Sequence, residues 1–397
     1  MNKIILKNIN VVDVVNDTVL AGQDVLIEDG VFKKIAVGIE DTDAQVLDKT
    51  GKYLVPGVID MHVHISWDGR HPAPMDLDDA EGILQAYVRA MNHAKISLKK
   101  GVTTVREVAS ANDLAIDLAY TIDKGYAVGC RVVPCGAAIQ GTYGHVPLVG
   151  TIADTDDEII KAIRYKKNLM THKGVTCQWI KIMATGGAAG IEDVGPSMYS
   201  LEQLKMIVSE CHRLHMKVAA HALSREGIIN CIEAGIDTIE HGADIPEEYL
   251  YKMKEKGLTL VPTLSVYKML AASSGQIPEV TVVKAKRVVD QQKKTFADAL
   301  RIGVNIAMGT DAGSPNFGPH PNAFEELLVM QEYGMDAKAV MKSATITAAE
   351  VLGLGREIGS IEVGKKADCI IANENPYENL NTFEKVDSVY KDGVLVE

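Results

Sequence analysis

The sequence predicts an α/β protein in which a (β/α)8 TIM barrel carries a small β-sandwich domain formed by the N- and C-terminal segments. Two observations predict this architecture. Eight near-continuous apolar runs separated by helical segments fill the middle of the chain, as in parallel strands that are buried on both faces. Short alternating runs with turn pairs fill both ends. We expect the small domain over residues 1–55 and 357–397, and the barrel over residues 56–356.

The two terminal segments share one pattern, in which apolar and polar residues alternate around a tight-turn pair. Asp29-Gly30 supplies hairpin-turn chemistry near the N-terminus, and Asp392-Gly393 supplies it near the C-terminus. Because the patterns are so similar, we expect the two ends to pair in one small sheet rather than to form two unrelated appendages. The alternating runs are residues 4–12, 25–35, 367–372 and 388–396.

The middle of the chain alternates apolar strands with amphipathic helices. One helix is marked by Ser200 and Gln203 at capping-box spacing, and Gly235 and Gly257 stand where helix C-caps are expected. An open doubly wound sheet is the competing architecture, but the glycine cluster at residues 353–359 follows a helix and has the wrong spacing for a dinucleotide loop. The candidate strands are residues 58–65, 102–108, 131–139, 178–184, 217–222, 236–241, 258–264 and 304–310.

Length and charge limit the possible functions. At the usual size of about 150 residues per domain, 397 residues suggest two or three domains unless one barrel accounts for most of the chain. Hydrophobic residues make up 47% and charged residues 24%, which is the composition of a folded globular protein and not of a disordered one. The formal net charge of -12 gives no general attraction for nucleic acid or anionic membranes, so we expect neither as a partner.

The N-terminus lacks the marks of a secretory signal. Residues 1–13 alternate in the manner of a β-strand, without a basic start, an apolar block and a small-residue cleavage site. No stretch reaches the run of about 18 apolar residues that a membrane-spanning helix needs. The 6 cysteines are scattered without CxxC spacing, as expected for reduced, mostly buried thiols. We therefore expect a cytoplasmic protein.

Candidate metal ligands stand at the carboxyl ends of five predicted strands. His62 and His64 alternate on one strand, so both imidazoles face the same side. In a barrel, inward-pointing residues at the strand ends converge at one mouth. Each residue alone has a structural explanation, such as a hydrogen-bonded core histidine, a helix cap or a buried ion pair, but their agreement in position favours a metal site. The set is His62, His64, Lys181, His221, His241 and Asp311.

These residue types suit a hydrolytic metal site. Neutral imidazole and carboxylate bind divalent zinc, and a catalytic site keeps a coordination position open for water. A buried lysine with a lowered pKa, such as Lys181, can react with carbon dioxide to form a carbamate, whose two oxygens are able to bridge two metal ions. Two bridged ions would lower the pKa of a shared water and polarise a substrate carbonyl. Asp311 could take a proton from that water and pass it to a leaving nitrogen.

At these residues the chain resembles the amidohydrolase superfamily and, within it, the imidazolonepropionase-like and prolidase-like branch. The resemblance extends over essentially the whole chain. The HxH pair alone is a weak signal, but the ordered set of segments is highly specific. The matching segments are 55–64 (VPGVIDMHVH), 101–106 (GVTTVR), 180–187 (IKIMATGG), 239–242 (IEHG), 309–313 (GTDAG) and 359–368 (GSIEVGKKAD).

The resemblance implies a hydrolase with two divalent metal ions, zinc being favoured, bridged by Lys181 as a CO2-derived carbamate. The HxH pair would bind one ion, and the histidines of the fifth and sixth strands would bind the other. Asp311 would be both a ligand and the general acid/base. Relatives commonly assemble, so we expect a homo-oligomer acting on a small-molecule substrate.

The resemblance favours cleavage of a C–N amide bond in a dipeptide or an N-acyl amino acid. Imidazolonepropionase itself fits less well, because its site resembles a mononuclear type that lacks the lysine of the fourth strand. A hydrolase or deaminase of a cyclic amide or heterocycle, using the same site, is the alternative. A catalytically silent scaffold is a third hypothesis, but it gives no physical reason to keep the whole ligand set.

Four residues are candidates for substrate binding. Tyr143 and His145 follow the third strand and could reach the substrate carbonyl or carboxylate, or could belong to a solvent-facing loop. Prolidase-like relatives place a tyrosine or histidine two residues beyond the histidine of the fifth strand, where this chain has Leu223. Arg225 is near enough to substitute for it, although a helix start also suits a surface charge. His320 lies on the loop after the eighth strand.

Overall fold

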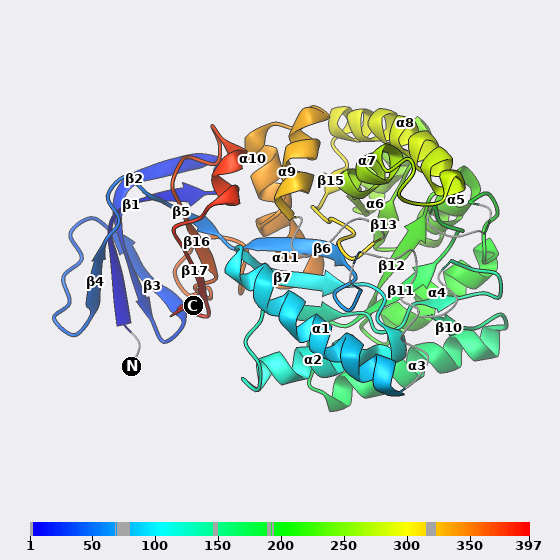
Figure 1. The fold of residues 1–397 in the computed structure, drawn as a ribbon, viewed down its shortest axis with the longest axis horizontal. Coiled ribbons are helices and arrows are strands. Elements are labelled where there is room, and N and C mark those ends of the chain that lie inside the picture. Colours follow the sequence, from blue (N-terminus) through cyan, green and yellow to red (C-terminus); the bar gives the residue numbers. More distant parts are fainter. Residues whose placement is uncertain are drawn as a thin grey trace.

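The computed structural model describes residues 3–67, 69, 80–145, 150–188, 192, 194–314 and 323–397. Both ends of the chain form a sheet that lies beside a larger α/β part (Figure 1). Within the described ranges, none of the helices combines the length and the apolar character that crossing a bilayer requires.

The terminal sheet has eight strands in the order β18-β17-β16-β5-β1-β2-β3, with β4 also paired to β1. Asp29 and Gly30 have φ of 50° and 83°, so the predicted turn pair does close the β2–β3 hairpin. Antiparallel pairing of β5 with β16 joins the two ends of the chain in one continuous sheet, while the sandwich arrangement stays a prediction. The strands are β1 (Lys3–Asp13), β2 (Thr18–Glu28), β3 (Val31–Ala36), β4 (Gln45–Asp48), β5 (Tyr53–Pro56), β16 (Cys369–Ala372), β17 (Ser388–Lys391) and β18 (Val394–Leu395).

The α/β part contains a strand in each of the eight predicted apolar runs, and all of these strands pair in parallel. They form a sheet β6-β7-β8 and a sheet β10-β9-β11-β12-β13-β14-β15. The third run is divided because Gly136 has a φ of 71° and the amide of Ala137 donates to Asp113 Oδ1 at 2.7 Å. The strands are β6 (Val58–Val63), β7 (Val102–Glu107), β8 (Arg131–Pro134), β9 (Ile139–Gln140), β10 (Thr151–Ile152), β11 (Trp179–Met183), β12 (Lys217–Ala222), β13 (Thr238–His241), β14 (Thr259–Val261) and β15 (Asn305–Ile306).

The segment after β15 is hydrogen-bonded to β6, so the last apolar run lies beside the first. The Met61 amide donates to the Met308 carbonyl at 2.9 Å, and the Asp311 amide donates to the His62 carbonyl at 2.7 Å. The buried Asp60 carboxylate reinforces this pairing, because its Oδ1 accepts the amides of His62 and Thr310 at 3.1 and 3.0 Å. Residues 250 positions apart in the chain are thereby held together.

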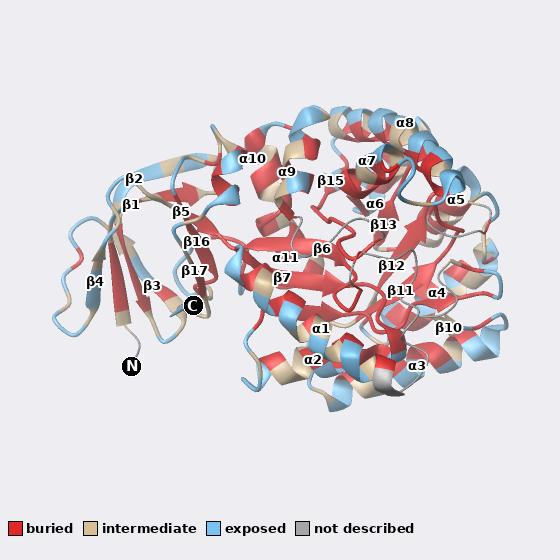
Figure 2. Ribbon diagram, in the orientation of Figure 1, coloured by how far each residue is buried: buried red, intermediate tan, exposed pale blue. Residues whose placement is uncertain are grey.

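The helices lie around these strands, with buried inner faces and exposed outer faces (Figure 2). The predicted capping box is present: the Gln203 amide donates to Ser200 Oγ, and the Ser200 amide donates to Gln203 Oε1, both at 3.2 Å. Gly235 and Gly257 end helices in the left-handed conformation, as predicted. The helices are α1 (Ala80–Lys99), α2 (Leu114–Asp123), α3 (Asp156–His172), α4 (Leu201–Arg213), α5 (Arg225–Ala234), α6 (Glu247–Lys256), α7 (Leu264–Ala272), α8 (Glu279–Ile302), α9 (Ala323–Glu332), α10 (Ala337–Ser343) and α11 (Ile346–Leu352).

Candidate metal centre

The strand ends bring four histidines and one aspartate into a single buried cluster. The ring centroid of His62 lies 5.4 Å from that of His64 and 4.9 Å from that of His241. His221 and His241 are 4.7 Å apart by the same measure. Asp311 Oδ1 lies 3.0 Å from His64 Nε2 and 3.6 Å from His62 Nε2. Ligand atoms of His62, His241 and Asp311 lie within 4.8 Å of one another, a spacing at which one ion can bind all three.

Two of these residues have unusual backbone conformations. His241 and Asp311 have φ of 70° and 63°, in the left-handed region that non-glycine residues seldom adopt. His241 ends β13 and Asp311 lies in the segment after β15, and such strain persists only where the surrounding structure maintains it. The adjacent Gly309 permits the close packing, because a Cβ there would lie 2.9 Å from the Cβ of His62. Both outliers therefore support a functional role for this edge of the sheet.

Lys181 is buried in β11, and no described residue forms a hydrogen bond with its Nζ. Burial lowers the pKa of Lys181 to about 8, although the charge of Glu240 opposes this effect. A buried ammonium without a partner is unfavourable, whereas a neutral amine is less costly to bury and is the form that reacts with carbon dioxide. The unpaired amine and the surrounding imidazoles therefore fit a carbamate-bridged metal pair.

Three of the histidines are held in the neutral form that metal binding requires. His62 Nδ1 lies 2.6 Å from Glu240 Oε2, and His241 Nδ1 lies 2.7 Å from Thr263 Oγ1, so each Nδ1 is engaged. Burial, followed by repulsion from Lys181, lowers the pKa of His62 to about 4. Burial also holds the pKa values of His221 and His241 well below the usual value. Neutral imidazoles result, with Nε2 of His62 and His241 left for a ligand.

Arg106 and Glu240 were not selected as functional residues from the sequence. Arg106 Nη2 donates to Glu240 Oε1 at 2.7 Å, and its Nε and Nη1 donate to the Met61 carbonyl and to Thr238 Oγ1. Burial raises the pKa of Glu240, but Arg106 and His62 outweigh this effect and the net pKa is lowered. The ionised carboxylate therefore fixes the orientation of His62. The sequence does contain one signal that could have identified them: both are charged residues within otherwise apolar strands, beside the candidate ligands.

Among the substrate-binding candidates, His145 joins the cluster. Its ring stacks on His221 with centroids 4.7 Å apart, and its Nδ1 lies 2.6 Å from Oε1 of Glu192, a residue that the sequence did not indicate. Gly187 makes room for this arrangement, because a Cβ there would lie 2.2 Å from His145 Cε1. Tyr143, two residues earlier, is 62% exposed.

The remaining candidates are not part of the described cluster. The side chain of Arg225 is 63% exposed, and its Nη2 lies 2.9 Å from Asp244 Oδ1. His320 lies outside the described residues.

Trp67 was not anticipated from the sequence, yet its ring stacks on His64 with centroids 4.0 Å apart and planes 11° from parallel. An apolar wall therefore covers one face of this candidate ligand.

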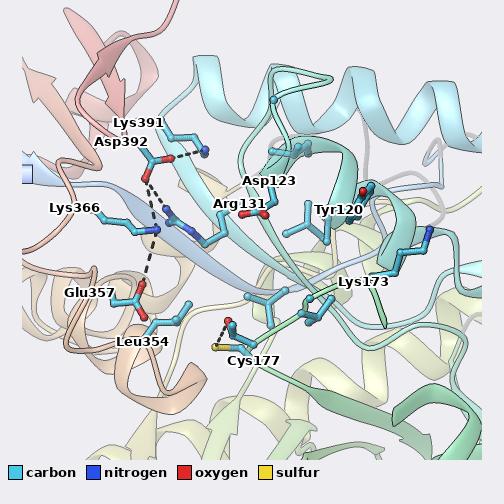
Figure 3. A pocket seen from close by; sticks show the side chains of 18 residues that line it. Tyr120, Asp123, Arg131, Lys173, Cys177, Leu354, Glu357, Lys366, Lys391 and Asp392 are labelled. Carbon is cyan, nitrogen blue, oxygen red and sulfur yellow. Dashed lines mark hydrogen bonds and ion pairs between the residues drawn. The ribbon is translucent and has the colours of Figure 1, made fainter. Parts of the chain in front are cut away.

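A separate hollow of about 360 Å³ lies where β8 and β11 begin, beside the terminal sheet (Figure 3). Arg131, which lines it, donates to Asp368 at 2.6 Å and to Asp392 at 3.0 Å. Lys391 Nζ adds a contact of 2.8 Å to Asp392. This paired network, hereafter the junction, connects the two parts of the molecule.

The family model of the amidohydrolase family matches residues 53–396, and the chain belongs to this family. Among solved structures, an Xaa-Pro dipeptidase with methionine bound in its active site matches with a TM-score of 0.89 and 31% identity, covering 100% of both chains. Ochratoxinase of Aspergillus niger is 30% identical over 385 residues, covering 86% of this chain and 75% of that protein. Imidazolonepropionase of Geobacillus sp. (strain WCH70) is 24% identical over 418 residues, covering 95% and 91%.

These matches confirm the imidazolonepropionase-like and prolidase-like branch that the motifs indicate. The fold of the neighbours implies a TIM-barrel α/β domain. The chain is a hydrolase of the amidohydrolase superfamily, a class that acts on carbon–nitrogen bonds.

Proposed function

We propose that this protein hydrolyses an amide bond in a dipeptide or an N-acyl amino acid. The observation that carries the proposal is the buried, unpaired amine of Lys181 within a cluster of imidazoles and the Asp311 carboxylate. The similarity to an Xaa-Pro dipeptidase supports peptide-like substrates. Fold alone would not decide this, because one fold hosts many activities.

The proposed metal centre uses six side chains. His62 and His64 would hold one divalent ion, the histidines of β12 and β13 would hold the other, and Lys181 would bridge them as a carbamate. Asp311 would be the sixth ligand. Zinc suits this set of nitrogen and oxygen donors. When bound, the ions supply a water of lowered pKa and polarise the scissile carbonyl.

Asp311 is the proposed general acid/base. Burial raises its pKa, but the hydrogen bond to His64 and the neighbouring histidines outweigh burial, so its pKa lies below the usual value. The carboxylate is therefore ionised near neutral pH and can accept a proton from the attacking water. It then passes this proton to the leaving nitrogen as the C–N bond breaks.

Substrate contacts are proposed for Tyr143, His145, Arg225 and His320. The pairing of His145 Nδ1 with Glu192 supports this role for His145, because it leaves Nε2 to face the substrate carbonyl or carboxylate. We also propose a closed (β/α)8 barrel, supported by the hydrogen bonds between β6 and the segment after β15. A homo-oligomeric, cytoplasmic enzyme completes the proposal.

Substrate profiling tests this function. Purified protein, supplied with Zn²⁺ and bicarbonate, is assayed against Xaa-Xaa dipeptides and N-acyl amino acids, and in parallel against cyclic ureides and aminated heterocycles. We expect turnover in the first group. Turnover restricted to the second group would favour the cyclic-amide alternative, to which the similarity to imidazolonepropionase points. Metal content well below one equivalent per chain, without activation by added metal, would contradict the proposed centre.

A further inference from the structure

Tyr267 is a buried tyrosine beside the cluster that the proposed mechanism does not use. It lies in the first turn of α7, which follows β14 at the carboxyl ends of the strands. Its side chain is almost inaccessible to solvent, with an exposed fraction of 4%. The ring meets His241 edge to face, with centroids 5.5 Å apart and planes 85° from parallel. Tyr267 therefore lies directly beside His241 of the cluster.

The position of Tyr267 is fixed by its helix and not by its own hydroxyl. The Glu326 carboxylate of α9 is buried and accepts the backbone amides of Leu264 and Ser265 at 2.8 and 2.7 Å. Thr263, just before the helix, binds His241 Nδ1 through its hydroxyl. These contacts anchor the start of α7 relative to the cluster, and Tyr267 is carried with it.

The hydroxyl of Tyr267 has no hydrogen-bond partner among the described residues, unlike the hydroxyl of Tyr199, which donates to the Ala153 carbonyl. Among the described residues, this hydroxyl is not one of the fully buried polar atoms that lack a partner, so it is open to a hydrogen bond with a bound molecule. A tyrosine hydroxyl keeps its proton near neutral pH. The group is thus a hydrogen-bond donor beside His241 of the cluster.

We propose that the Tyr267 hydroxyl donates a hydrogen bond to the scissile carbonyl oxygen of the substrate; this inference rests on the proposed amide hydrolysis. When water oxygen bonds to the carbonyl carbon, the π electron pair moves onto the carbonyl oxygen. The hydrogen bond to Tyr267 strengthens as this charge develops, and the tyrosine keeps its proton. The carbonyl then re-forms, the C–N bond breaks, and Asp311 delivers to nitrogen the proton that it took from water.

Tyr267→Phe tests the proposal, because it removes the hydroxyl and retains the ring that packs on His241. Loss of one preorganised donor to a developing oxyanion should lower kcat by about 10²-fold, with KM changed by less than about threefold. A phosphonate analogue of the scissile amide, which mimics the tetrahedral geometry, should lose affinity by a comparable factor. Metal content and thermal midpoint should equal those of the wild type.

Tyr377→Phe is the matched control, since the Tyr377 hydroxyl donates to the Asp13 carbonyl at 3.1 Å in the terminal sheet. We expect this variant to keep the wild-type kcat and phosphonate affinity. A wild-type kcat in Tyr267→Phe would overturn the inference, as would a rate loss that merely follows lost metal or a lowered thermal midpoint. If the wild type cleaves no amide at all, the proposed function itself fails, and the inference fails with it.

Discussion

The two ends of the strands in the α/β part differ in whether their buried polar and charged groups have partners. At the amino-terminal ends, the junction pairs Arg131 with Asp392 (Figure 3) and with Asp368. At the carboxyl ends, Lys181 Nζ and His64 Nδ1 are buried without a hydrogen-bond partner among the described residues. A buried polar group left unpaired costs about 1–3 kcal/mol. The junction therefore needs nothing more to be stable, whereas the carboxyl ends are arranged to receive a bound group.

Replacing one lysine at each end tests this comparison most strongly. In Lys181→Ala we expect the loss of the bridged metal pair and a fall in activity of at least about 10³-fold, because bound ions provide several kcal/mol of transition-state stabilisation. Short carboxylic acids should restore part of the activity by replacing the carbamate. Metal analysis and initial rates measure both effects.

Lys366→Ala provides the matched control at the junction. Lys366 Nζ lies 3.8 Å from both Glu357 and Asp392, as part of a solvent-accessible network. Metal content and rate should be unchanged in this variant. Wild-type metal content and rate in Lys181→Ala would remove the carbamate from the mechanism. The lysines at the two ends of the strands would then be equally dispensable for activity.

The second prediction concerns the carboxylate of the cluster. Asp311→Asn keeps the shape of the side chain but cannot accept the proton, so kcat should fall by at least about 10²-fold. Asp392→Asn at the junction, where the carboxylate pairs with Arg131 and Lys391, should leave kcat unchanged. Steady-state kinetics on metal-loaded proteins distinguishes the two variants, and an equal loss of kcat in both would contradict the assignment.

The third prediction concerns Glu240, a buried carboxylate at the carboxyl ends that does have partners. Glu240→Gln removes the charge that orients His62 through Nδ1, and such changes typically weaken metal binding by about 10–100-fold. Asp244→Asn, in the exposed pair with Arg225, is the control and should not change metal affinity. Competition with a chelator measures both. Unchanged affinity in Glu240→Gln would limit the Arg106–Glu240 pair to a structural role.

The fourth prediction is that the two ends respond to pH in opposite directions. Burial raises the pKa of Glu326 from 4.5 to about 7, although its hydrogen bonds to Ser265 and Leu264 oppose this. The folded protein then holds a proton that the unfolded chain has lost, so the stabilising contribution disappears as the pH rises from 4.5 through 7. Burial raises the pKa of Asp392 as well, but Lys391 and Arg131 outweigh it and lower the net value below 3.8. Its contribution is therefore present above 3.8 and is lost as the pH falls through the folded pKa.

Urea unfolding across this pH range checks both signs. Glu326→Gln should flatten the loss of stability on the neutral side, and Asp392→Asn should flatten the loss on the acid side. Parallel profiles for the two variants would contradict the opposed pKa shifts.

The strands and the histidine pair could be predicted because their determinants are local. A buried parallel strand is a continuous apolar run, and two imidazoles two residues apart on a strand must share a face. The Asp29-Gly30 turn is equally local, since both residues need a positive φ. These features require no knowledge of which strand lies beside which.

The supporting residues could not be predicted, because their roles depend on register between distant segments. Parallel pairing sets Glu240 opposite His221, and this register, together with Arg106 on β7, turns its carboxylate toward His62. Likewise, Glu192 reaches His145 only through the arrangement of two loops 47 residues apart. Such partners become visible only when the sheet is assembled.

The smallest expected effect concerns Arg225, where sequence position and geometry point in different directions. Its distance from His221 along the chain allowed a substrate contact, but its guanidinium pairs with Asp244 and is 63% exposed. Exposed pairs contribute about 0–1 kcal/mol, so Arg225→Ala should change stability by no more than this and KM by less than about twofold. Steady-state kinetics on the best dipeptide provides the measurement. A rise in KM of tenfold or more would show that Arg225 leaves Asp244 to bind the substrate, and the group of residues that recognises the substrate would then extend to the surface of α5.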